Sequence, residues 1–171
     1  PIQLTQPVFP EKVILDGSTR IFISVKRMNV GIAPFAAHAS KMYPLDLMKE
    51  VIEALSKEYH IILFGGGKEE EVVLNDFEST FNNVVSAAGK LPLNEEMDVI
   101  SNLDVMLSMD SGNAHLAAMM GIKVITIWGV THPYAGFAPF NQPEDYALLS
   151  DRSKFPLIPT SVYGNKYPDG Y

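Results

Sequence analysis

Four residues with chemically useful side chains or backbone freedom stand close together: Asp110, Ser111, Gly112 and His115, between two apolar segments. Glycine lets the backbone approach a ligand closely, and aspartate and serine place polar oxygens at the same turn. If a helix begins at this turn, its free amides favour an anion such as a diphosphate. His115 then lies one helical turn beyond Ser111, so that both side chains can face one pocket. The pattern therefore indicates a turn that binds a phosphate-bearing ligand.

Other interpretations of these residues stay open. Asp110 and Ser111 are also residue types that cap helices, and His115 on an otherwise apolar helix is often a core histidine with satisfied hydrogen bonds. A hydrolase triad is not favoured, because the three residues are too close in sequence and no G-x-S-x-G motif is present. Asp110 and His115 are metal-ligand types, but the spacing suggests no third ligand, and we expect no metal site.

Apolar runs alternate with helix-like segments along the middle of the chain, which is typical of parallel β-α units. Helical spacing of apolar residues predicts a helix over 45–59, directly after Pro44. Asn94 is expected to cap a later helix, and Gly121 to close a helix of small residues. This alternation predicts an α/β fold with a Rossmann-like, doubly wound parallel sheet. The expected strands span residues 30–35, 60–67, 83–89, 104–109 and 123–129.

The predicted fold locates a binding site. In a doubly wound sheet, ligands bind beyond the carboxyl ends of the strands at the point where the strand order reverses. We expect this point between the first and fourth strands, which selects the loops 35–41 and 110–115. Lys41 would supply a positive charge for phosphates there, although alone it also fits a solvated surface lysine. The G-G-G-K run at 65–68 is not the dinucleotide fingerprint, because its third glycine is missing.

Composition narrows the function classes. The chain has 171 residues, a net charge of −7 and no cysteine. Because it has no positive field and no basic run, we expect neither nucleic acid nor a charged membrane surface as a partner. The absence of cysteine excludes disulfides and suits a reducing, cytoplasmic location. No apolar run is long enough for a transmembrane segment, and the first residues do not resemble a signal peptide.

The domain organisation is expected to be simple. Residues 29–150 are predicted to form one Rossmann-like domain for a nucleotide sugar. Residues 1–28 are a linker or N-terminal extension, in which positions 16–17 could also turn a hairpin. Residues 151–171 form a proline- and aromatic-rich C-terminal tail, expected to be ordered loop without a closing helix. Because the chain begins at Pro1 and not at methionine, we expect it to be a fragment of a longer protein.

The segment DVMLSMDSGNAHLAAMMGIKVITIWGVTHP, residues 104–133, resembles the signature of the heptosyltransferase-type glycosyltransferases, glycosyltransferase family 9. In that family a strand ends in an acidic residue, followed by Ser or Thr, Gly, two variable positions, His-Leu-Ala-Ala and a later Gly-x-Thr-x-Pro turn. The segments VGIAPFAAHASKMYPLDLMKEVIEAL, IILFGGGKEEE and AAGKLPLNEEMDVISNLDVMLS resemble the family's first loop, second strand and Gly-Lys-x-x-Leu segment. The resemblance covers residues 30–136.

This resemblance implies the GT-B fold, in which two Rossmann-like domains enclose a sugar nucleotide and an acceptor. The chain would be the second, donor-binding domain. Carried over by position, the diphosphate and donor sugar would be held by Asp110, Ser111, Gly112 and His115. The diphosphate charge would be balanced by Lys41 with the backbone near Ala36 and Ala37. Glu69 or a neighbouring acid would contact the ribose or base, and Leu91 would flank the base.

The resemblance also implies a reaction. A sugar, heptose or a similar one, would move with inversion from a nucleoside-diphosphate donor, ADP-linked by preference, onto a lipopolysaccharide or surface-glycan acceptor. The general base and acceptor groove would lie on the missing N-terminal half, so no catalytic residue is assigned here. No metal or other cofactor is expected, because protein cations and helix amides can carry the leaving-group charge and no Asp-x-Asp motif is present. The implied location is the cytoplasm, including the inner face of the bacterial inner membrane.

Several positions depart from the family pattern. Met42 and Tyr43 stand where Trp usually precedes the proline, Met109 where a polar residue is frequent, and His132 where Asp is common. These changes leave nucleotide binding in place and the donor sugar open. A non-catalytic nucleotide-binding or sensor module is the alternative to an enzyme fragment. A second Rossmann-like half upstream in the native gene would favour the enzyme.

Overall fold

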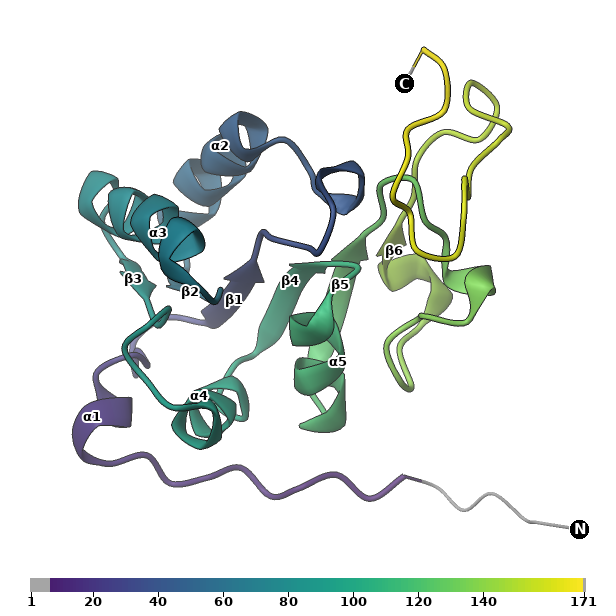
Figure 1. The fold of residues 1–171 in the computed structure, drawn as a ribbon. Helices are drawn as coiled ribbons and strands as arrows, with labels where there is room; N and C mark the ends of the chain where they lie inside the picture. Colours follow the sequence, from purple (N-terminus) through teal and green to yellow (C-terminus); the bar gives the residue numbers. More distant parts are fainter. Residues whose placement is uncertain (1–6, 171) are drawn as a thin grey trace, which may run out of the picture.

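A six-stranded parallel sheet forms the centre of residues 7–170, the part of the chain that the computed structural model describes (Figure 1). Its strands lie in the order β3-β2-β1-β4-β5-β6. The predicted doubly wound α/β fold is confirmed. The strands are β1 (Asn29–Ala33), β2 (His60–Leu63), β3 (Val84–Ser86), β4 (Val105–Met109), β5 (Lys123–Ile127) and β6 (Ala147–Leu148), and the α-helices are α1 (Gly17–Arg20), α2 (Leu45–Ser56), α3 (Lys68–Thr80), α4 (Leu93–Ile100) and α5 (Gly112–Met119).

Helices cover both faces of this sheet, as a buried parallel sheet requires. All residues of β1 are buried, which matches its nearly continuous run of apolar side chains. One core packs α4 and α5 against Ile62, Met106 and Val124 of the sheet. The second core lies on the opposite face, where Met48 and Ile52 of α2 are fully buried together with side chains of α3. Complete burial of such a side chain stabilises the fold by about 1.5–3 kcal/mol.

The helix starts differ from the prediction at one position. Pro44 precedes α2 as expected, but α4 begins after Pro92, and Asn94 lies inside its first turn. The prediction that Asn94 caps α4 is therefore wrong. Proline is suited to a helix start because its φ is fixed and it has no amide to leave unpaired. Gly121 follows α5 with a φ of +77°, in agreement with its expected role at the helix end.

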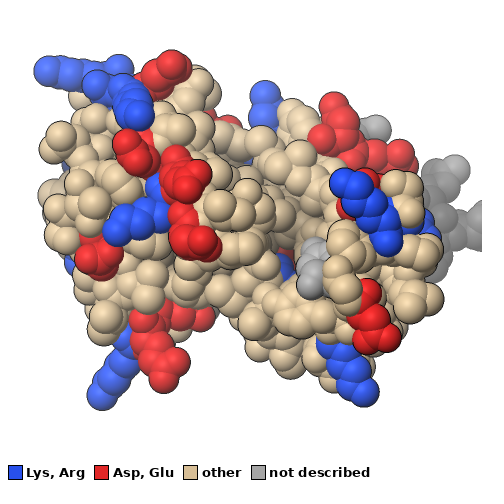
Figure 2. All heavy atoms as spheres, turned by 90° about the horizontal axis from the view of Figure 1, so that it is seen from above, with Lys and Arg blue, Asp and Glu red and all other residues tan. Residues whose placement is uncertain are grey.

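The order of the strands reverses between β1 and β4, as predicted. From β1 the chain proceeds through β2 to β3 at one edge, then returns through α4 to place β4 on the other side of β1. The residues that directly follow Ala33 and Met109 therefore meet at the same edge of the sheet. Seen from above that edge, the surface is hollowed between two lobes, and the charged side chains in view lie mainly on the lobes (Figure 2).

The structure adds a sixth strand to the five that the periodicity predicts. β6 pairs in parallel with Thr126 and Ile127, and the amide of Trp128 donates to the carbonyl of Leu148 at 2.9 Å. Between β5 and β6 the chain forms two short 3₁₀ turns instead of a helix. A strand of two residues has no measurable periodicity, so the sequence pattern could not reveal it.

The two ends of the described chain lie at opposite edges of the sheet. The N-terminal segment runs below α4 and α5, whereas the tail stands above β5 and β6 (Figure 1). Positions 16–17 do not turn a hairpin; Gly17 begins α1, a single turn of helix. Residues 1–6 of the predicted linker and Tyr171 of the tail lie outside the described residues. The division at residues 28 and 150 stays a prediction.

Within residues 7–170, no helix combines the length and the apolar character needed to cross a membrane.

Candidate functional site

A buried polar cluster stands at the carboxyl edge of the sheet, where three loops meet. Lys41 Nζ lies 2.9 Å from Asp110 Oδ2, and Thr131 Oγ1 donates to the same oxygen at 2.8 Å. The side chains of Lys41 and Asp110 are 15% and 5% exposed. Lys41 follows β1, Asp110 follows β4 and Thr131 follows β5. These three residues are called the switch-point cluster below, and Lys41 is a member of it and not a solvated surface lysine.

Close backbone approach brings these loops together. Ser40 and Lys41 belong to a 3₁₀ turn, Ala39–Lys41, and the Val130 amide donates to the Ser40 carbonyl at 3.0 Å. At Gly129, a Cβ atom would lie only 2.2 Å from that same carbonyl oxygen. Glycine is therefore required there, because any side chain would push the loop after β5 away from the loop after β1.

Asp110 is held by side chains and not by the helix that follows it. At the sequence level, amides of the next turn or hydroxyls of a donor sugar are its expected partners. Both of its hydrogen-bonding contacts in the described chain use Oδ2, from Lys41 and Thr131, and none comes from an amide of α5. Oδ1 is left without a protein partner among these residues, so this oxygen remains able to accept a hydrogen bond from a ligand.

The start of α5 lies directly beside the cluster. Ser111 occupies the N-cap position, but its side chain makes no capping bond; its hydroxyl lies 3.2 Å from that of Ser108. Ser111 therefore stands at the cap position, but the alternative interpretation that its side chain caps the helix does not hold in this structure. A Cβ atom on Gly112 would meet no atom within 4 Å, so the protein itself leaves space at the first turn. His115 is half-buried on the same helix.

The other predicted donor residues follow β1, β2 and β3, on loops or in the first turn of a helix. Ala36 is half-buried and Ala37 exposed just after β1, while Leu91 is half-buried between β3 and α4 and packs against the core of α4 and α5. Glu69 is exposed in the first turn of α3. No contact joins Glu69 or Leu91 to the switch-point cluster in the described chain, and their contact with a donor stays a prediction.

Neighbouring acidic residues are more firmly placed than Glu69. The Glu70 carboxylate accepts the Gly66 amide at 2.8 Å. The Glu71 carboxylate lies beneath Gly89, where an added Cβ atom would stand 2.5 Å from it. Glu71 of α3 therefore packs against Gly89 in the loop after β3, which begins the Gly-Lys-x-x-Leu segment.

Thr131 is the member of the cluster that reasoning from sequence did not select. It is only 2% exposed, and its hydroxyl fixes the carboxylate of Asp110. The signal for it was present, because Thr131 stands in the Thr-His-Pro turn that resembles the family's Thr-x-Pro motif. Within residues 7–170, no group of three or more histidine or acidic side chains is arranged to hold a metal ion.

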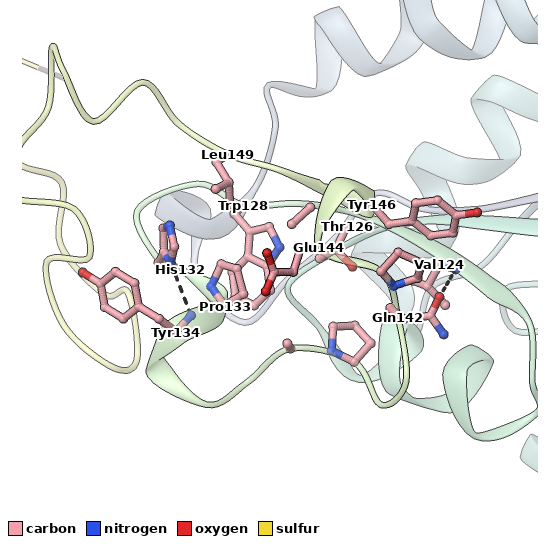
Figure 3. A pocket seen from close by; sticks show the side chains of 14 residues that line it. Val124, Thr126, Trp128, His132, Pro133, Tyr134, Gln142, Glu144, Tyr146 and Leu149 are labelled. Carbon is pink, nitrogen blue, oxygen red and sulfur yellow. Dashed lines mark hydrogen bonds between the residues drawn. The ribbon is translucent and has the colours of Figure 1, made fainter. Parts of the chain in front are cut away.

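A second hollow lies beside β5, under the crossover that leads to β6 (Figure 3). Its volume is about 500 Å³. Val124, Thr126 and Trp128 of the strand and its extension form one side, and residues 132–149 form the rest. The indole Nε1 of Trp128 is buried and has no hydrogen-bond partner among residues 7–170. This cavity is called the crossover hollow below.

His132, which lines the crossover hollow, has a lowered pKa. His132 and Tyr134 contact each other with ring centroids 4.2 Å apart, and Nδ1 of His132 accepts the Tyr134 amide at 3.3 Å. Partial burial lowers the pKa of His132, and the positive charge of Arg152 lowers it further. The guanidinium carbon of Arg152 stands 5.3 Å from the centre of the Tyr134 ring.

Comparison with known proteins shows which protein family the chain resembles. The sequence model of "Glycosyltransferase family 9 (heptosyltransferase)" matches residues 1–156. The chain is 31% identical over 114 residues to lipooligosaccharide heptosyltransferase 2 of Haemophilus influenzae, a match that covers 63% of this chain and 33% of that protein. It is 29% identical over 135 residues to lipopolysaccharide core heptosyltransferase OpsX of the same organism, covering 77% of this chain and 39% of that protein.

A solved structure supports the fold. The heptosyltransferase WaaC of E. coli, in a structure with ADP, superposes with a TM-score of 0.65 at 21% identity, covering 78% of this chain and 42% of that one. The chain thus spans less than half the length of the relatives it matches. The matched part is the Rossmann-like unit described above, which agrees with the expectation of one half of a GT-B fold.

Proposed function

The chain belongs to glycosyltransferase family 9, the heptosyltransferase family, and from this premise we propose that it is the donor-binding half of an inverting glycosyltransferase. It would bind a nucleoside-diphosphate sugar, carrying heptose or a similar sugar, for transfer to a lipopolysaccharide or surface-glycan acceptor. The relatives named as heptosyltransferases support this class of sugar. The WaaC structure with ADP supports adenine as the base.

The observation that carries this proposal is the position of the switch-point cluster beside the start of α5. The ammonium of Lys41 has three N–H donors, and Asp110 engages only part of them. The remaining donors and the uncapped amides of α5 can bind the oxygens of a diphosphate together. The open space at Gly112 allows such a ligand to approach the backbone.

Asp110 takes two roles in this arrangement. Through Oδ2 it fixes Lys41 and partly balances its charge while no ligand is bound. Through Oδ1 it accepts a hydrogen bond from a hydroxyl of the donor sugar. Because a carboxylate repels phosphate oxygens, the diphosphate lies toward Lys41 and α5, and the sugar lies toward Asp110.

The chemical step follows from this placement. An acceptor hydroxyl, deprotonated by a carboxylate of the N-terminal half, attacks the anomeric carbon from the side opposite the diphosphate. The bond between that carbon and the phosphate oxygen breaks, and its electron pair leaves with the nucleoside diphosphate. Lys41 and the amides of α5 stabilise the negative charge that develops on this leaving group, which is how the protein can act without a metal ion. The reaction would take place in the cytoplasm, at the inner face of the membrane that carries the acceptor.

Calorimetry with ADP in the presence of a chelator tests donor binding. The chain should bind ADP without metal, and Lys41→Ala should weaken binding by about ten-fold or more, because a charged hydrogen-bond donor is lost. Lys49→Ala is the matched control, because it removes a lysine whose exposed ion pair, with Asp76, lies outside the switch-point cluster. Strict dependence on magnesium would contradict the metal-free site.

A transfer assay tests the division between the two halves. The isolated chain should bind the donor but transfer no sugar, whereas joining it to an upstream Rossmann-like half should restore transfer. Turnover by the isolated chain would contradict this division. Donor binding without transfer by the joined protein would favour a nucleotide-binding or sensor module.

A further inference from the structure

We propose that residues 158–166, called the tail loop here, form a further wall of the donor site and position Lys41 for the diphosphate. This inference rests on the proposed function of the switch-point cluster. The cluster itself comes from the loops after β1, β4 and β5, and the tail loop closes over it from a part of the chain that follows β6.

Hydrogen bonds fasten the tail loop to the two loops that carry Lys41 and Thr131. The Thr160 amide donates to the carbonyl of Val130 at 3.1 Å, and the Ser40 hydroxyl donates to the carbonyl of Gly164. Val130 and Ser40 are themselves joined, because the Val130 amide donates to the Ser40 carbonyl. The neighbours of Lys41 and Thr131 in sequence are therefore tied to one another and to the tail loop.

The tail loop is also closed on itself. The Gly164 amide donates to the Ser161 hydroxyl at 2.9 Å, and the Thr160 hydroxyl donates to the Lys166 carbonyl at 2.7 Å. Ile158, at its start, is only 1% exposed. These bonds give the loop one defined shape over the cluster, which a solvated chain end would not have.

Gly164 makes the contact on which the inference depends. Its φ is +62°, a conformation that L side chains rarely adopt. A Cβ atom there would lie 2.4 Å from Thr131 Cγ2 and 3.1 Å from Lys41 Cγ. The backbone of the tail loop thus packs directly against the two side chains that contact Asp110.

This contact limits where the ammonium of Lys41 can go. A lysine side chain has many rotamers, and the Asp110 carboxylate alone restrains only its tip. With Gly164 against Cγ and Asp110 at Nζ, the stem and the tip are both held. We therefore assign Gly164 as a positioning residue, which acts on the diphosphate through Lys41.

The experiment compares ADP with adenosine as calorimetric probes of the whole chain. Gly164→Ala should weaken ADP binding by about ten-fold, as expected when a charged hydrogen bond is misplaced, and should leave adenosine binding unchanged. A loss of general folding would weaken both ligands together. Gly170→Ala is the matched control, because Gly170 has a φ of +78° and no atom within 4 Å of its Cβ position. This control should bind ADP like the unaltered chain.

A gentler variant covers the case in which Gly164→Ala does not fold. Ser40→Ala removes the hydrogen bond to the Gly164 carbonyl without adding an atom, and it should weaken ADP binding about three-fold with adenosine binding unchanged. Unchanged or tighter ADP binding in these variants, while Lys41→Ala weakens it, would overturn the tail-loop inference and leave the donor site intact. Unchanged ADP binding in Lys41→Ala would instead overturn the role of Lys41 in the proposed function.

Discussion

Residues 128–134 contribute to both the switch-point cluster and the crossover hollow, yet the two regions differ in polarity. Thr131 points to Asp110 in the cluster, while Trp128, His132 and Tyr134 line the hollow. In the cluster a lysine, a carboxylate and a hydroxyl contact one another through Asp110 Oδ2. In the hollow aromatic rings and prolines are frequent, and a buried indole N–H has no partner in the described part of the chain.

This difference shows how each region obtains its shape. Charged groups in a buried place require partners at fixed distances, so the cluster is preorganised, and removal of the Asp110 carboxylate takes the partner from both Lys41 and Thr131. Apolar walls require only filled volume, so the hollow tolerates changes of chemistry at similar size. Variants that remove one polar group from each region test this contrast directly.

The largest effect is expected at Asp110. Asp110→Asn keeps the shape but leaves the mostly buried ammonium of Lys41 without a counter-charge, and should lower the free energy of unfolding by about 2–3 kcal/mol. Denaturant unfolding measures this loss. The affinity for ADP should change much less than the rate of sugar transfer by the complete enzyme, because removal of a negative charge near the diphosphate offsets the looser hold on Lys41.

Two comparisons make the Asp110 result decisive. Asp76→Asn, in the exposed pair with Lys49, should change stability by less than about 1 kcal/mol. If Asp110 served only to cap α5, asparagine would replace it equally well, and neither stability nor transfer would change. That outcome would remove Asp110 from the donor site.

A smaller effect is expected at Trp128. Trp128→Phe removes the unpaired indole N–H, whose burial is unfavourable, together with part of a buried ring. The two contributions oppose each other, so the free energy of unfolding should change by no more than about 1 kcal/mol, whereas Trp128→Ala should cost about 3–5 kcal/mol. A loss above about 2 kcal/mol in the phenylalanine variant would mean that the N–H is satisfied in solution.

The smallest effect concerns protonation at the mouth of the hollow. NMR titration should give His132 a pKa below 6.5, since burial and the charge of Arg152 both disfavour its protonated form. A lowered pKa in the folded state means that His132 contributes stability above pH 6.5 and that this contribution is lost as the pH falls. Protonation of Nδ1 also removes the acceptor for the Tyr134 amide.

The charge of Arg152 can be separated from burial. Arg152→Gln should raise the pKa of His132 only part of the way to 6.5, because burial is the larger cause and remains. Full return to 6.5 would contradict that order of causes. Lys154→Gln, which removes a neighbouring exposed charge paired with Asp151, is the control.

Local periodicity was sufficient for most of the fold. The buried strands and the helices between them follow from apolar runs and from spacings of three and four residues, and those segments form the sheet as predicted. Two features were missed where the sequence pattern is very short or fits two positions. β6 has only two residues. Asn94 lies two residues after Pro92, and both residue types are common at helix starts, but α4 begins after Pro92.

The sequence by itself determined that Lys41 and Asp110 would meet, because parallel strands on either side of a switch point bring the loops that follow them to one edge. Only the tertiary structure decided that Lys41 is paired and buried, that Thr131 completes the cluster, and that Gly164 packs over it. The physical reason is distance along the chain. Ser40 and Gly164 are 124 residues apart, and contacts between irregular loops at such separation depend on packing, for which no repeating sequence pattern exists.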